Sequence, residues 1–510
     1  MHVSRTRRTR IISGLVAVGT ACAITAVAPQ ASAAPATPGR HTLPGSTPQW
    51  LHQARDVGST AQSSTVHFGV LLNMRNADRA SAQIQALSDP HSASYGDWLS
   101  NAQFNAQYAP AKSDVSAVQS WLRTQGFSVS STLPSGMYVQ ASGTAAQIEK
   151  TFATSLNNYE LQGKTVRANA TALSLPSNTP AVVTSAVNGV LGVDQGTSLK
   201  TPADTLPGPP TGARYGVQPC SAYYGQKTAT TLPKAYGKKQ TYAVCGYQPA
   251  QLQAAYGETS LLKRGVTGKG VTVAITDAYA APTILQDANR YSQLHGQPRF
   301  TKGQFTQFTP GADGYGLVDE CGGNGWYGEE TLDVEAVHAM APGAKIIYVA
   351  GADCSSGLDD AWASTIDNHV ADIITNSWTD GIDDVADLGQ SYIDFYQQFS
   401  TEAALTGITV NFSSGDSGDH TAGGTDLASK TAEFPADLPY VTGVGGTSLE
   451  IGNHGQWVGE YGWQSAYSLL TNGAWAPAPP GTYSSGGGGG TSQLFPQPFY
   501  QTGVVPTSIS

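Results

Sequence analysis

The sequence predicts two folded units, an α+β domain followed by an α/β domain with a doubly wound, mostly parallel sheet. The chain has 510 residues, roughly three times the length of an average domain. A proline-rich stretch at 197–214 separates two different residue patterns. Beyond it, short β-branched runs alternate with helical patterns, which is typical of parallel strands joined by crossover helices. We therefore place the domain boundary in this stretch.

Residues 1–33 have the pattern of a secretory signal peptide. Basic residues precede an apolar run at 11–28, and the small residues Ala31, Ser32 and Ala33 provide a cleavage site. We expect a secreted, extracellular protein with no membrane attachment once the signal is removed. The alternative is an uncleaved anchor, because about 18 apolar residues nearly span a bilayer.

The first folded domain is predicted at 61–196, after a flexible polar segment at 34–60. The stretches 66–72 and 137–140 have the pattern of strands, and 113–125 has that of an amphipathic helix. This alternation predicts a small α+β sandwich. The residues at 197–215 are small, polar and rich in proline, which is typical of an exposed, cleavable linker.

The second domain is predicted at 216–510. Its strand patterns lie at 271–275, 345–349, 372–375 and 408–412, and its helical patterns at about 281–295, 328–340, 358–369 and 390–406. Doubly wound sheets carry their chemistry at the carboxyl ends of the strands. We therefore expect functional residues at Asp277, at 376–378 and at 413–418.

The composition excludes partners that need a basic surface. Charged residues make up only 13% of the chain, and 27 lysines and arginines against 37 aspartates and glutamates give a net charge of −10. We therefore expect no binding to nucleic acid or to an anionic membrane.

The cysteines indicate disulfides. Four of the five cysteines remain after removal of the signal, an even number that suits an oxidising compartment. We expect the two local pairs, Cys220 with Cys245 and Cys321 with Cys354, because each closes a loop of moderate length. Other pairings stay open, because the sequence does not fix connectivity.

The densest group of candidate catalytic residues lies in the helical pattern at 328–340. At about 100° per residue, Glu329 and Asp333 are about 40° apart and face the same way, whereas Glu330 and Glu335 point elsewhere. Two carboxylates at this spacing repel each other, so a partly buried pair holds one proton between them and suits a base that works in acid. The alternative is an acidic first turn that only complements the helix dipole.

Histidine-based and zinc-based catalysis find little support. His338 lies about 180° around the helix from Glu329, so we expect a packed or surface histidine. Asp277 follows a predicted strand, where subtilisin-like enzymes keep their triad aspartate, but the His-Gly-Thr motif of those enzymes is absent. The sequence has no His-Glu-x-x-His motif, which argues against a zinc peptidase.

Motifs in both domains together resemble the sedolisins, the serine-carboxyl peptidases. In the second domain they are the carboxyl-pair helix, Ala341-Pro342-Gly343-Ala344-Lys345, Ser414-Gly415-Asp416-Ser417-Gly418, Phe434-Pro435-Ala436, 441–447, 484–487 and 495–501. In the first domain they are Ser88-Asp89-Pro90, Tyr95-Gly96, Tyr108-Ala109-Pro110, Trp121-Leu122, Gly143-Thr144 and Gly189-Val190-Leu191-Gly192, which resemble that family's activation propeptide. The resemblance covers nearly the whole exported chain.

The resemblance implies a subtilisin-like fold preceded by a ferredoxin-like propeptide domain, and an acid-acting endopeptidase made as a zymogen. It implies that Glu329 takes the proton from a serine nucleophile and that Asp333 orients Glu329. Asp416 would be the protonated carboxyl group that donates a hydrogen bond to the oxyanion. The implied partners are protein or peptide substrates and the propeptide as an intramolecular inhibitor, and we expect a monomer.

Two features of the family are not found in the sequence. Sedolisins carry the nucleophile motif and an Asp- and Gly-rich calcium loop near their carboxyl end, so Ca²⁺ is expected by resemblance, but its loop is not in this chain. Ser448 lies in a context that matches an earlier, non-catalytic segment, and Ser492 lacks the small residues that should open the following helix.

Three interpretations of the missing nucleophile follow. The first and favoured one is that the sequence is a piece of a longer sedolisin. The others are a truncated, inactive product and an enzyme that uses a non-standard serine. An inactive chain would be a binding protein or pseudoenzyme that keeps the peptide cleft.

Overall fold

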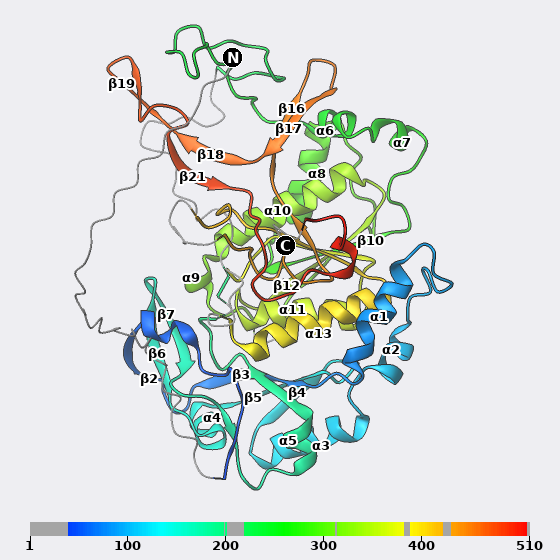
Figure 1. Cartoon of the computed structure of the whole chain (residues 1–510), viewed down its shortest axis with the longest axis vertical. Coiled ribbons are helices and arrows are strands. Elements are labelled where there is room, and N and C mark those ends of the chain that lie inside the picture. The colour runs from blue at the N-terminus through cyan, green and yellow to red at the C-terminus, as the bar shows by residue number, and fades with distance from the viewer. Residues whose placement is uncertain are drawn as a thin grey trace, which may run out of the picture. The chain divides into compact units, whose positions relative to one another are not determined.

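The computed structural model describes residues 39–197, 199–200, 219–311, 314–381, 388–421 and 430–506 (Figure 1). The predicted signal peptide at 1–33 and most of the predicted linker at 197–215 lie outside these residues.

The stretch 41–59 belongs to the segment that we expected to be flexible, but it is structured. It contains β1 (His41–Thr42), η1 (Gln49–Gln53) and β2 (Arg55–Ser59). The main chain of this stretch finds hydrogen-bond partners in later strands, since β1 pairs with β8 (Ser174–Leu175) and β2 pairs with β6 (Leu156–Leu161).

The amino-terminal domain is built on a four-stranded antiparallel sheet with the order β4-β5-β3-β9. Its strands are β3 (Thr65–Leu72), β4 (Ser128–Thr132), β5 (Tyr138–Thr144) and β9 (Val187–Leu191), and β7 (Lys164–Asn169) extends the small sheet of β2 and β6. Its helices are α1 (Ala77–Ser88), α2 (Asn101–Gln107), α3 (Lys112–Thr124), α4 (Ala145–Phe152) and α5 (Ala181–Ala186). Alternate residues of β3, Val66, Phe68 and Val70, are buried against Phe152 in one core.

The second sheet has six parallel strands in the order β11-β12-β10-β13-β14-β15. Its strands are β10 (Thr272–Ala278), β11 (Phe305–Phe308), β12 (Lys345–Gly351), β13 (Ile373–Asn376), β14 (Thr409–Ser413) and β15 (Thr442–Val444). The helices of this part are α6 (Pro249–Ala255), α7 (Thr259–Lys263), α8 (Ile284–Leu294), α9 (Val318–Cys321), α10 (Gly323–Met340), α11 (Ser356–Asp367) and α13 (Gln390–Thr406). This is the doubly wound parallel sheet that the sequence predicts.

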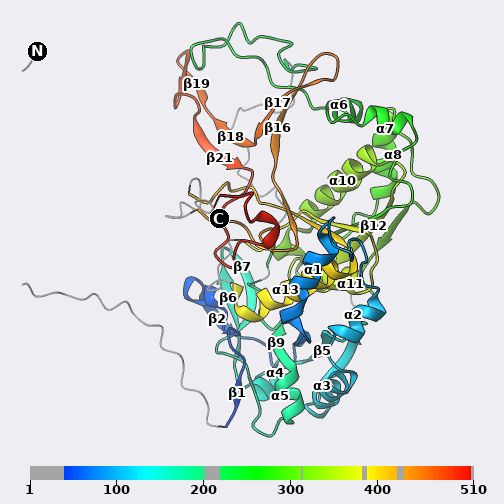
Figure 2. The ribbon, with the colours of Figure 1, turned by 45° about the vertical axis from the view of Figure 1, so that its right-hand side comes forward.

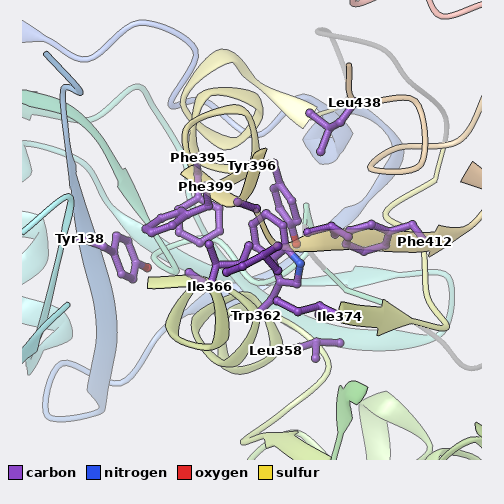
Figure 3. Close-up of a cluster of buried hydrophobic side chains, with 14 of the residues drawn as sticks. Tyr138, Leu358, Trp362, Ile366, Ile374, Phe395, Tyr396, Phe399, Phe412 and Leu438 are labelled. Atoms are coloured by element: carbon purple, nitrogen blue, oxygen red, sulfur yellow. The ribbon is translucent and has the colours of Figure 1, made fainter. Parts of the chain in front are cut away.

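Consecutive residues of β10 face two different cores. Ile275 packs with Val334 of α10 on the face that α8 and α10 cover, and Figure 2 shows these two helices side by side. Ala274 belongs to the larger core on the opposite face, which contains Trp362 of α11 and Phe399 of α13 (Figure 3). A central parallel strand is apolar on both sides because helices cover both faces.

The amino-terminal domain packs on α11 and α13. The ring centroid of Tyr138 in β5 lies 5.2 Å from that of Phe395 in α13, in an edge-to-face arrangement (Figure 3). The backbone N–H of Ser135 donates to Asp367 Oδ2 over 3.0 Å. Aromatic packing and hydrogen bonds therefore tie the two domains together within one compact unit of residues 38–510.

The remaining strands form small antiparallel hairpins. They are β16 (Thr447–Ile451) with β17 (Trp457–Gly462), β18 (Gln464–Tyr467) with β21 (Thr482–Gly486), and β19 (Leu469–Thr471) with β20 (Ala474–Ala476), followed by η3 (Phe499–Gln501). Both expected disulfides, Cys220–Cys245 and Cys321–Cys354, are present. In the described part of the chain, no helix combines the length and the apolar character needed to cross a membrane.

Candidate active site

Helix α10 places Glu329 and Asp333 in the interior of the molecule. The helix follows Gly322, which adopts a left-handed φ of +64°, and it stops at Ala341, before a proline that cannot donate a helical hydrogen bond. Trp326 and Val334 anchor it in the core. As a result, Glu329 and Asp333 are only 9% and 8% exposed, which is far more burial than an acidic first turn in solvent would show.

Asp277 joins this pair from β10. It is fully buried near the carboxyl end of the strand. Burial, together with the charges of Asp333 and Glu329, raises the pKa of Asp277 well above its ordinary value. The position that suggested a subtilisin-type aspartate thus contributes a third carboxyl group to the pair on α10.

A serine from the next strand holds Asp333. Ser377 directly follows β13, and its Oγ donates a 2.8 Å hydrogen bond to Asp333 Oδ2. Burial raises the pKa of Asp333 to about 6, although this hydrogen bond acts in the opposite direction. The neighbouring Trp378 fixes the loop, because its Nε1 donates to the carbonyl oxygen of Thr276 over 2.8 Å.

The other acidic residue next to the pair faces away from it, as the helix geometry predicts. Glu330 is fully buried and accepts hydrogen bonds from the N–H of Ala281 (2.5 Å) and from Gln307 Nε2 (2.8 Å). Burial raises its pKa to about 7. Glu330 therefore fastens α10 to neighbouring elements and offers a matched control for Glu329.

His338 is a packed residue, as expected. Its Nε2 donates a 2.7 Å hydrogen bond to the carbonyl oxygen of Pro298, and its ring stacks on Phe300 with centroids 3.8 Å apart. Burial lowers the pKa of this histidine, which favours the neutral imidazole.

Asp416 lies at the same edge of the sheet but has different neighbours. It follows β14, two strands along from β10, and all these strands are parallel, so their carboxyl ends share one edge. Burial and the charge of Glu433 raise the pKa of Asp416. Glu433 packs directly behind it, because a Cβ on Gly415 would lie 2.0 Å from the Glu433 carboxyl group. His420 Nε2 in turn lies 3.1 Å from Glu433 Oε1.

The two serines that the sequence singled out have structural neighbours of their own. Ser448 is an exposed residue of β16 opposite Tyr461 in β17. The hydroxyl of Ser492 donates a hydrogen bond to Asp437 Oδ2 over 2.7 Å. It also accepts hydrogen bonds from the N–H groups of Leu494 and Phe495. We assign the nucleophile to neither residue.

No step of the chemistry is assigned to calcium. Within the ranges that the structure describes, no three histidine, cysteine, aspartate or glutamate side chains are arranged to hold a metal ion. The calcium loop that the resemblance implies is not found in the sequence, so Ca²⁺ stays an untested expectation.

Comparisons with known proteins agree with this arrangement in both domains. Residues 52–195 match the family described as "Pro-kumamolisin, activation domain", and residues 320–494 match the "Subtilase family". Sedolisin from Pseudomonas sp. (strain 101) is 27% identical over 458 residues, which is 88% of this chain and 69% of that protein. The chain is therefore similar to sedolisin along most of its length. An activation domain therefore precedes a subtilase-type domain, as the motifs predict.

One further relative and one solved structure are also similar to the chain. Xanthomonalisin from Xanthomonas sp. (strain T-22) is 27% identical over 434 residues, which is 79% of this chain and 48% of that protein. The chain thus spans about half the length of this sedolisin relative. A solved structure of Pseudomonas sedolisin, titled a serine-carboxyl proteinase complexed with pseudo-iodotyrostatin, is 23% identical, with a TM-score of 0.41 and coverage of 51% of this chain and 67% of that one.

Sequence reasoning missed the neighbours that support the carboxyl groups. Ser377 lies in the stretch 376–378 that the strand pattern indicated, so its position was signalled but its bond to Asp333 was not. Glu433 directly precedes the Phe434-Pro435 motif and carries no pattern of its own. Its proximity to Asp416 depends on a long-range fold contact.

Proposed function

We propose that this chain is the zymogen form of a secreted serine-carboxyl endopeptidase that cleaves proteins in acid. The observation that carries the proposal is the buried cluster of Glu329, Asp333 and Asp277 at the carboxyl edge of the parallel sheet. Carboxyl groups crowded in this way keep protons to a higher pH than isolated ones, so they exchange protons in the acidic range.

Glu329 is the general base of the proposed reaction. It removes the proton from a serine hydroxyl as the oxygen attacks the carbonyl carbon of the substrate, and it returns the proton to the leaving amine. Asp333 shares the proton with Glu329, while Ser377 holds the Asp333 carboxylate in place. Asp277 stays protonated next to them, because a third charge would be strongly unfavourable in this buried position.

Asp416 is the proposed oxyanion donor. A carboxyl group donates a hydrogen bond only while it is protonated, and the raised pKa of Asp416 extends the pH range in which it is. As the pH rises through the pKa values of Asp416 and Asp333, the oxyanion donor is lost and the cluster gains charge. Activity therefore falls toward neutral pH.

The amino-terminal domain is the proposed intramolecular inhibitor. It matches an activation domain and packs on α11 and α13 of the peptidase domain. Its removal, after a cut in the linker, frees the cleft for a protein substrate. Secretion follows from the predicted signal peptide.

The test compares two neighbouring glutamates. We expect Glu329→Gln to lower cleavage of an unfolded protein substrate at pH 4 by about 10²–10⁴-fold, the usual contribution of a general base. Glu330→Gln should keep near-normal activity at pH 4, because Glu330 is already protonated there. Equal activity of the Glu329→Gln and wild-type proteins would refute the assignment. A wild-type protein that binds peptides but cuts none would favour the pseudoenzyme alternative.

A further inference from the structure

Lys200 occupies a closed site at the surface where the two domains meet. It follows β9 and lies near the start of the predicted cleavable linker, yet its side chain is fully buried. Its Nζ lies 2.7 Å from Asp359 Oδ1, 3.0 Å from Asp380 Oδ1 and 3.1 Å from the hydroxyl oxygen of Tyr392. The ammonium group thus donates to Asp359 and to Tyr392 and forms a second ion pair with Asp380.

Aromatic rings complete the walls of this site. Nζ lies 5.0 Å from the ring centroid of Trp378 and 5.8 Å from that of Tyr392, within the range of cation–π attraction. The hydroxyl groups of Tyr392 and Tyr396 each donate to Asp359 Oδ1, at 3.0 Å and 2.5 Å, and so fix the carboxylate. We call this set the lysine box: Trp378, Asp380, Asp359, Tyr392 and Tyr396.

The lysine box belongs entirely to the peptidase domain, whereas its occupant does not. Asp359 lies on α11, Tyr392 and Tyr396 lie on α13, and Trp378 and Asp380 follow β13. The occupant arrives on a segment from the amino-terminal domain. The box would therefore stay behind, with two desolvated carboxyl groups, when that segment leaves.

The segment also binds through its main chain, as a peptide does in a cleft. The N–H of Lys200 donates to the carbonyl oxygen of Cys354 over 2.9 Å, and Ser355 Oγ donates to the carbonyl oxygen of Gln195 over 3.2 Å. Trp378 in the box is the neighbour of Ser377, which contacts Asp333 of the carboxyl cluster. The box and the carboxyl cluster are therefore held by two consecutive residues of the segment that follows β13.

We propose that the lysine box is a recognition site for a lysine side chain of a bound polypeptide substrate, and that Lys200 fills it in the uncleaved chain. The inference rests on the proposed function, because it names a side chain that the substrate presents. Burying an ammonium group is costly unless charged and hydrogen-bonding partners compensate, and the box supplies both. The box receives the compact ammonium group at the end of a lysine, whereas the planar guanidinium group of arginine is wider and requires a different placing of the acceptors.

The first experiment tests the box without relying on catalysis. In the full chain, Lys200→Ala leaves a space that matches n-propylammonium, and thermal unfolding is followed as this ion is added. We expect a saturable rise in Tm for Lys200→Ala, no rise for wild type or for the exposed-lysine control Lys150→Ala, and no rise with n-propanol. The double variant Lys200→Ala/Asp380→Asn should respond less. No response, or an equal response to n-propanol, would overturn the proposed site.

The second experiment asks whether the box selects substrates. The full chain is first cut within residues 201–218. It is then mixed with peptides that copy residues 194–200 and extend beyond them. One peptide has lysine at the position of Lys200, and the other has norleucine there. We expect cleavage or binding to favour lysine by at least about tenfold, because a site built for polar contacts rejects an analogue that lacks them, and Asp380→Asn should remove most of the preference.

The two hypotheses fail in different ways. Cleavage without a preference for lysine would overturn this inference and leave the peptidase function intact. Binding with a preference for lysine, but no cleavage at pH 4, would overturn the function and retain the site.

Discussion

Two clusters of buried carboxyl groups lie at the same edge of the parallel sheet, and they differ in what neutralises them. In the cluster of Glu329, Asp333 and Asp277, burial raises the pKa of Asp277 and of Asp333, and the neighbouring negative charges raise that of Asp277 further. The lysine box places an ammonium group between its two carboxylates. Protons stabilise the first cluster, and a cation stabilises the second.

The difference shows that burial alone does not decide the chemistry of an aspartate. Burial raises the pKa of Asp380 to about 7, while Lys200 acts against that shift. Burial likewise opposes the charged form of Lys200, but Asp359 and Asp380 outweigh it and raise the pKa of the lysine. The box therefore suits fixed charge and recognition, whereas the other cluster suits proton transfer.

The largest expected effect on stability comes from removing the cation. We expect Lys200→Met to lower the free energy of unfolding of the full chain at pH 7 by about 3–5 kcal/mol, because it leaves two buried carboxyl groups without a positive partner. Urea denaturation followed by tryptophan fluorescence measures the change.

A matched pair of variants sharpens this prediction. Lys150→Ala, at an exposed position, should change the free energy by less than about 0.5 kcal/mol. Adding Asp380→Asn to Lys200→Met should recover part of the loss, since one buried charge is then absent. A loss below about 1 kcal/mol for Lys200→Met would mean that water or protonation already neutralises the box.

The next largest effect on stability is expected from replacing Asp277 in the carboxyl cluster, and it should stabilise the protein. The folded-state pKa of Asp277 is raised, so its contribution to stability is complete at low pH and is lost as the pH rises. An asparagine side chain in its place cannot ionise. We therefore expect Asp277→Asn to be more stable than wild type by about 1–3 kcal/mol at pH 8 and nearly equal to it at pH 4. Thermal unfolding at both pH values measures this, and an equal difference at both would contradict a titrating Asp277.

The sequence predicts local geometry well and long-range partners poorly. The common face of Glu329 and Asp333 follows from helical spacing, and both disulfides join cysteines only 25 and 33 residues apart. Lys200 and Asp359 are 159 residues apart, and the lysine lies in a stretch whose composition indicates an exposed linker. The strand pattern indicates that Asp277 lies at the functional edge of the sheet, but its carboxyl neighbours come from another element and are not visible in that pattern.

The smallest expected effect on stability is that of replacing His338, and this variant distinguishes a packed histidine from a catalytic one. His338 lies on the same helix as Glu329, but its hydrogen bond goes to Pro298 and its ring stacks on Phe300. We expect His338→Gln to lower the free energy of unfolding by about 1 kcal/mol, through lost stacking and a weaker hydrogen bond, and to leave the pH dependence of peptide cleavage unchanged. The measurement is the rate of cleavage between pH 3 and pH 7 for both proteins. A pH profile that shifts with this substitution would assign proton transfer to the histidine and displace Glu329 from the role of base, whereas a lower Tm with the same profile leaves proton transfer with the carboxyl cluster.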